Sequence, residues 1–150
     1  MGTDLKKEKL VKFEYTSGGM FLQDSILGFD TQKSGVLSFL SEASFLTHDN
    51  SITKFITTEE NVKLLSLKKR VFTPLTCQYN RPFSIGSLKM ELLPSGSSLG
   101  GASLYVEHNK NRILYAPYIC TQKFSTLRQF QLKRATTLVL GAFLSDENLK

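Results

Sequence analysis

LLPSGSSLGGASLYVEHNKNRILYAPYI, residues 92–119, is the stretch that decides the fold we expect of this chain. It begins with the end of an apolar strand at residues 92–93 and continues as a loop of mostly small residues, 94–103. A second strand then leads into residues 108–111, whose asparagines accept the positive φ values that a hairpin turn needs. The next strand, residues 112–115, is aliphatic and aromatic. The stretch therefore predicts antiparallel strands around a compact loop.

The order of these features resembles that of metallo-β-lactamase-fold nucleases of the β-CASP type, such as mRNA 3′-end-processing enzymes and DNA-ligase-associated exonucleases. In that family the loop carries a metal-binding His, where this chain has Ser97. The strand after the hairpin ends in Tyr-small-Gly-Asp, whose Asp bridges two metal ions, where this chain reads YAPY and ends on Tyr118. The resemblance thus implies a retained scaffold without these two metal ligands.

Residues 43–48 predict a strand that runs into a loop, and they can be compared with a second motif of the same family. The family follows this strand with His-x-His-x-Asp-His, four ligands that hold a pair of zinc ions. Aligned on His48, the other three positions are Asn50, Ile52 and Thr53. Only one of the six ligand positions keeps its donor, and zinc needs at least three protein donors even in an open catalytic site. The resemblance therefore implies a pseudoenzyme with no bound metal or other cofactor.

The first third of the chain predicts a β-meander. Apolar and charged residues alternate over 10–15, and glycines at 18–19 mark a turn. A strand at 26–30 ends in Asp30, which we interpret as a strand-end or turn residue rather than a chemical group. Residues 36–41 are expected to form a short connector or a single helical turn.

A strand at 54–56 is followed by a predicted helix over 57–67. Thr57 and Glu60 have the spacing of a capping box. Lys68, Lys69 and Arg70 end the helix, where cations suit the negative end of its dipole. Contact of these three cations with phosphate is the alternative interpretation.

The second half of the chain predicts more strands. Residues 81–92 predict a hairpin in which Leu88, Met90 and Leu92 share one face. Residues 120–134 allow either a short helix capped by Ser125 or a covering loop. The nearly continuous apolar run at 136–143 is typical of a strand buried on both faces.

Length and composition favour one domain spanning residues 1–150, with an ordered core over about 10–145. We expect an α/β (α+β) class, with a mixed, mainly antiparallel sheet and few helices. The resemblance covers the family's first half only, so we expect half of an αββα sandwich, with most of the second sheet supplied from outside this chain. An exposed apolar sheet face would then bind a protein partner or a second copy.

Other features of the composition limit the location and the partners. No apolar run approaches the roughly 20 residues that cross a bilayer, so we expect no membrane contact and a cytoplasmic location. Cys77 and Cys120 are expected to be reduced and structural, and His108 to be solvated in its hairpin turn. The net charge of +6 and the pI near 9.4 permit contact with nucleic acid.

Two functional classes remain open. The first is a catalytically inactive association or scaffolding subunit in a nucleic-acid-processing assembly. The second is a basic nucleic-acid-binding module without catalysis. A metal-free acid/base or nucleophile set built from His48, Asp49, Ser97 and Tyr118 is a minor alternative, because the sequence offers no group that would orient it.

Overall fold

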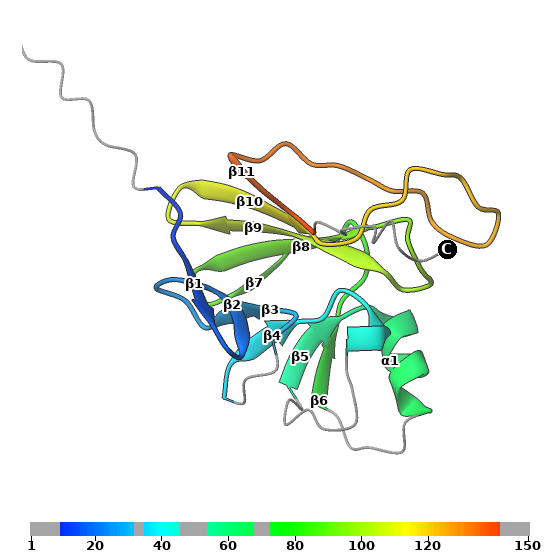
Figure 1. Ribbon diagram of the computed structural model, residues 1–150, viewed down its shortest axis with the longest axis horizontal. Coiled ribbons are helices and arrows are strands. Elements are labelled where there is room, and N and C mark those ends of the chain that lie inside the picture. Colours follow the sequence, from blue (N-terminus) through cyan, green and yellow to red (C-terminus); the bar gives the residue numbers. More distant parts are fainter. Residues whose placement is uncertain (1–9, 32–34, 46–53, 68–72, 142–150) are drawn as a thin grey trace, which may run out of the picture.

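The chain folds into two β-sheets that face each other (Figure 1). The computed structural model describes residues 10–31, 35–45, 54–67 and 73–141. The N-terminal sheet has the order β1-β2-β3-β4-β5-β6, and the C-terminal sheet has the order β11-β10-β9-β8-β7. The chain therefore supplies both sheets, and the expectation that most of the second sheet lies outside it is wrong. The α+β class with mixed sheets and few helices is confirmed.

The N-terminal sheet combines a meander with a parallel half. Its strands are β1 (Phe13–Thr16), β2 (Gly19–Leu22), β3 (Leu27–Phe29), β4 (Leu37–Phe39), β5 (Lys54–Thr57) and β6 (Thr73–Thr76). The pairs β1-β2 and β2-β3 are antiparallel, whereas β3, β4, β5 and β6 run parallel to one another. Because parallel strands end on the same side, the residues that follow β3 and β4 meet at one edge of the sheet.

The C-terminal sheet is built from two hairpins and a final edge strand. Its strands are β7 (Phe83–Ile85), β8 (Leu88–Pro94), β9 (Ala102–His108), β10 (Asn111–Ala116) and β11 (Thr137–Leu140). The β9-β10 hairpin turns at Asn109 and Lys110, both with positive φ, as the sequence predicted. β8 and β10 are each antiparallel to β9 and so run in the same direction, whereas β11 pairs with β10 in parallel.

Apolar side chains from both sheets form the core between them. The N-terminal sheet contributes residues such as Phe29 and Phe39, and the C-terminal sheet contributes the predicted trio Leu88, Met90 and Leu92. All five are at most 2% exposed. The predicted common face of that trio is confirmed, because it is the face that the sandwich buries.

The outer faces of the two sheets are covered in different ways. Helix α1 (Glu59–Ser66) and the short 3-10 helix η1 (Ala43–Phe45) lie over the N-terminal sheet. A segment without helix or strand, residues 117–136, passes over the C-terminal sheet (Figure 1). We call it the strap. Of the two alternatives left open at Ser125, the structure has the covering loop.

Three local expectations are wrong. Residues 36–41 contain strand β4 rather than a connector or helical turn, and residues 43–45 form η1 rather than a strand. β11 is half-buried on one face and exposed on the other, because it lies at a sheet edge. A short apolar run does not by itself distinguish a buried strand from an edge strand or a helical turn.

The cap of α1 is shifted by one residue from the predicted one. Thr58, not Thr57, is the N-cap, and its hydroxyl accepts the N–H of Asn61. Thr57 instead donates its hydroxyl to the carbonyl of Leu40 at 2.9 Å. The capping box proposed between Thr57 and Glu60 is therefore wrong, although a threonine does cap the helix.

Candidate functional site

Two of the residues aligned with the family's metal ligands lie in the described part of the chain, Ser97 and Tyr118. His48, Asn50, Ile52 and Thr53 lie outside the described residues, as do the candidate phosphate contacts Lys68, Lys69 and Arg70. The site is therefore built from Ser97 and Tyr118 and from the polar groups around them.

The ends of four strands bring these groups together. Asp30 follows β3, Ser41 and Glu42 follow β4 closely, Ser97 follows β8, and Tyr115 lies near the end of β10. The directions of these strands place their carboxyl ends at one side of the sandwich. We call these residues, together with Ser95, the strand-end cluster.

Asp30 joins the two sheets within this cluster. One carboxylate oxygen accepts the Ser41 N–H at 2.7 Å, and the other accepts the Ser41 hydroxyl at 2.7 Å and the Tyr115 hydroxyl at 2.8 Å. Asp30 is half-buried as a residue, but its carboxyl group points inward toward these donors. Burial raises its pKa from 3.8 to about 6, although the three hydrogen bonds act in the opposite direction.

The geometry fits the predicted role of Asp30 at the end of a strand and adds to it. Its φ is +44°, which asparagine and aspartate tolerate better than most residues. No local pattern indicated the contact with Tyr115, which lies 85 residues away. This contact makes Asp30 a polar link across the sandwich.

A second carboxylate, Glu42, is bound by serines. The Ser97 hydroxyl donates to Glu42 Oε1 at 2.6 Å, and the Ser44 hydroxyl donates to Oε2 at 3.4 Å. The Ser95 and Ser97 hydroxyls are 2.8 Å apart. A hydroxyl and a carboxylate in this contact have the distance that a nucleophile and its base require, but both take part in fixing the loop. Sequence reasoning missed Glu42, which lies 55 residues from Ser97.

Gly101 permits the serines of this loop to converge. A Cβ at Gly101 would lie 2.5 Å from Ser95 Oγ, 2.7 Å from Ser98 Oγ and 3.2 Å from Ser97 Oγ. A side chain would therefore displace these hydroxyls. The compact loop predicted from the sequence therefore depends on this glycine.

Tyr118 lies beside the cluster as a half-buried aromatic residue. Its ring is 5.2 Å from the ring of Phe45 in η1. Burial raises the pKa of its hydroxyl, and the negative charges of Glu42 and Asp30 raise it further. At neutral pH the group is therefore a neutral phenol, which can donate a hydrogen bond.

Helix α1 supports the loop from the other side. The Thr58 hydroxyl donates to the Gly100 carbonyl at 2.8 Å, and the buried Asn61 side chain donates to Thr57 Oγ1 at 2.9 Å. Gly100 has a φ of +78°, and a Cβ there would lie 2.7 Å from Asn61 Oδ1. The helix cap and the glycine loop thus fix each other.

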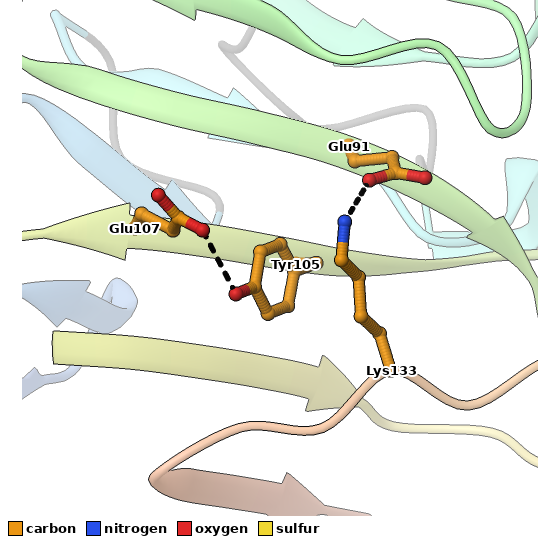
Figure 2. A network of polar contacts seen from close by, with 4 residues as sticks. All are labelled: Glu91, Tyr105, Glu107 and Lys133. Atoms are coloured by element: carbon orange, nitrogen blue, oxygen red, sulfur yellow. Dashed lines mark hydrogen bonds and ion pairs between the residues drawn. The ribbon is translucent and has the colours of Figure 1, made fainter.

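The strap is attached to the C-terminal sheet by a separate polar network (Figure 2). Lys133 forms an ion pair with the buried Glu91, and its ammonium lies 4.5 Å from the centre of the Tyr105 ring. The Tyr105 hydroxyl donates to Glu107 at 3.0 Å. Lys133 is therefore an anchor of the strap.

His108 is buried rather than solvated, with 8% exposure. Its Nε2 is 3.0 Å from Asn109 Nδ2, while Nδ1 has no hydrogen-bond partner among the described residues. It ends β9, so the pleat rather than the turn determines its direction. Cys77 and Cys120 are free, as predicted, and both are half-buried.

The described residues contain no group of three His, Cys, Asp or Glu side chains close enough to hold a metal ion. In the strand-end cluster the carboxylates Asp30 and Glu42 are accompanied by hydroxyl groups. Helices in the described part of the chain are too short or too polar to cross a bilayer.

No protein-family model and no curated protein matches the chain. Several solved structures are similar over part of it. A protein of unknown function from Enterococcus faecalis V583 is 18% identical over 57% of this chain and 25% of its own, with a TM-score of 0.47. The chain spans about a quarter of that protein's length.

Two other similar structures are named as metallo-β-lactamases. The HARLDQ-motif enzyme of Cronobacter sakazakii is 14% identical over 74% of this chain and 58% of its own, with a TM-score of 0.46. GOB-18 of Elizabethkingia meningoseptica is 17% identical over 77% of this chain and 58% of its own, with a TM-score of 0.39. The chain thus spans little more than half the length of either enzyme.

Proposed function

We propose that this chain is a non-catalytic, cytoplasmic domain of the metallo-β-lactamase type that acts by protein association in a nucleic-acid-processing assembly. The proposal that the chain is a pseudoenzyme is supported first by the sequence. Asn50, Ile52, Thr53, Ser97 and Tyr118 stand at five of the six positions where the family resemblance expects metal ligands. None of these side chains is among the donors that zinc prefers.

The strand-end cluster provides the structural support. The Ser97 hydroxyl donates to Glu42, and the Ser41 and Tyr115 hydroxyls donate to Asp30. Charge-assisted hydrogen bonds of this kind are about twice as strong as neutral ones. They supply hydrogen-bond donors to two partly buried carboxylates. We infer that hydroxyl groups occupy a region that a hydrolase would give to its metal.

Two measurements together test this proposal. The first is hydrolysis of bis(p-nitrophenyl) phosphate with added zinc or manganese, for the wild type and for S97A. We expect no rate above the buffer in either protein. A metal-dependent rate that H48A abolishes and S97A leaves unchanged would contradict the proposal.

The second measurement concerns association. Sedimentation velocity of the full chain across a concentration series should show reversible self-association, or the purified protein should recover a defined partner. A protein that stays monomeric at the highest soluble concentration, and that binds no component of such an assembly, would contradict the association role.

A second candidate function, nucleic-acid binding without catalysis, is favoured by the distribution of charge. Residues 108–145 contain six Lys and Arg and no Asp or Glu, so the rest of the chain carries thirteen of each sign. The net charge of +6 therefore resides in this one segment, which includes the strap. Lys123, Arg128 and Arg134 are exposed there, and Phe124 is 43% exposed. Cations interspersed with an aromatic ring suit single-stranded nucleic acid.

The salt dependence of binding distinguishes the two candidates. If the strap contacts phosphates, K123A/R134A should weaken binding to a single-stranded oligonucleotide and reduce the slope of log K against log salt by about 1 to 2. K54A/K63A removes the same charge from the N-terminal sheet and α1, and should leave the slope unchanged. Absence of binding at low salt would remove this candidate.

A further inference from the structure

The strand β11 differs from the other edges of the two sheets. β1 carries the charged Glu14, and β6 contains Pro74. β7 has only three residues and follows directly on Arg81-Pro82. Charge, proline and short length are the features by which natural proteins keep sheet edges from pairing with other chains. β11 reads TLVL and contains neither a charge nor a proline.

The outward side chains of β11 are two leucines. Leu138 is 53% exposed and Leu140 is 55% exposed, whereas Val139 between them packs against the core. Leu138 pairs with Leu114 and Leu140 with Ala116, both buried beneath the strap. The apolar outer face of the C-terminal sheet therefore extends beyond the strap to β11, where it is open to solvent.

We propose that β11 pairs antiparallel with β11 of a second copy of this chain, about a two-fold axis through Val139. This inference rests on the proposed association function and names its surface. Directly opposed residues in an antiparallel pair lie on the same face of the sheet. In this register Leu138 of each copy lies opposite Leu140 of the other, and the two Val139 side chains meet.

The pattern of the strand argues for a second copy as the occupant. A two-fold interface must be complementary to itself, and a leucine on each side of Val139 gives the same pattern in either direction. No charged side chain of β11 is brought opposite its own equivalent. The joined sheet would place four leucines in one apolar stripe. Leu138 and Leu140 of each copy would then be partly covered by those of the other copy.

Two features of the surroundings set the expected strength. The strand contributes four residues per copy, far fewer than the roughly 20 to 30 residues a side of a stable interface, so the dimer should be weak and reversible. The nearby strap is positively charged and repels its counterpart. Salt screens that repulsion, so the dimer should strengthen with salt, opposite to binding of nucleic acid.

Sedimentation velocity of the full chain tests the surface. The wild type should shift toward dimer with concentration, more so at about 0.5 M salt than at about 0.05 M, where screening is weaker. L138K should remain monomeric under the same conditions. L99K adds the same charge at a leucine of matching exposure, 54%, away from β11, and should dimerise like the wild type. Circular dichroism checks that both variants are folded.

Disulfide trapping tests the register. With Cys77 and Cys120 replaced by serine, V139C places two thiols opposite each other, within the Cα separation that a disulfide spans. T137C places the two thiols about four residue positions apart along the paired strands. Mild oxidation should crosslink V139C at least about tenfold faster than T137C, because only the first pair meets that separation. Equal rates would overturn the proposed register.

The outcomes separate the two proposals. A dimer that persists in L138K, or that L99K abolishes, overturns the β11 interface but leaves the association function standing on another surface. A wild type that is monomeric throughout overturns the β11 interface. The association function then stands or falls on recovery of a partner.

Discussion

Replacing Asp30 by asparagine should change how the stability of the fold depends on pH. Burial raises the pKa of Asp30 from 3.8 to about 6, so the folded protein binds a proton more tightly than the unfolded chain. The contribution of this group to stability is therefore largest at low pH and falls as pH rises from about 4 to about 6. The difference between the two pKa values corresponds to about 3 kcal/mol.

The three hydrogen bonds to Asp30 do not reverse this sign. Each is charge-assisted, but together they only partly offset the cost of burying the carboxylate. The carboxamide introduced by D30N cannot ionise, and it keeps one acceptor oxygen for the Ser41 N–H. D30N should therefore remove the fall in stability between about pH 4 and 6, whatever its effect at any single pH.

Urea unfolding at several pH values between about 4 and 7 provides the measurement. The free energy of unfolding of the wild type minus that of D30N should decrease by about 2 kcal/mol from about pH 4 to pH 7, because the unfolded carboxyl is already largely ionised at pH 4. E14Q removes an exposed carboxylate of β1 and serves as the control. If the free energies of unfolding of the wild type and D30N changed in parallel with pH, the proposed raised pKa of Asp30 would be refuted.

Three further predictions concern the loops around the site. T58A should lower the free energy of unfolding by about 1 to 2 kcal/mol because it removes the helix cap and the bond to the Gly100 carbonyl, whereas T58S should restore most of it in urea unfolding. G100A should cost at least about 1 kcal/mol in the same assay, since its φ is +78° and Asn61 Oδ1 occupies the space; wild-type stability would contradict the packing described. K133M leaves the Glu91 carboxylate buried without its partner, so the strap should be cut faster in limited proteolysis. The free energy of unfolding should fall by about 2 kcal/mol, after allowing for the partial exposure of Lys133. Unchanged cleavage would show that the ion pair does not hold the strap.

Local patterns predicted much of the framework. Alternation identified β1, β8 and the core face with Leu88, and asparagine chemistry identified the turn at Asn109. These features depend on residues close together in the sequence, so periodicity and turn chemistry carry the information.

The remaining features depend on contacts between distant residues. Leu37–Phe39 became a strand because parallel neighbours on both sides pair with it, and no local pattern shows such neighbours. The bonds from Ser97 to Glu42 and from Tyr115 to Asp30 join segments 55 and 85 residues apart. The sequence therefore predicted Ser97 as a lost ligand position but not the carboxylate that it binds.

Zinc binding tests the central claim most directly. After equilibrium dialysis of the full chain against micromolar zinc at neutral pH, metal content measured by mass spectrometry should be well below one zinc per chain, and H48A should give the same value. One or two zinc ions per chain that survive dialysis and are lost in H48A would contradict the claim that this fold no longer holds a metal centre.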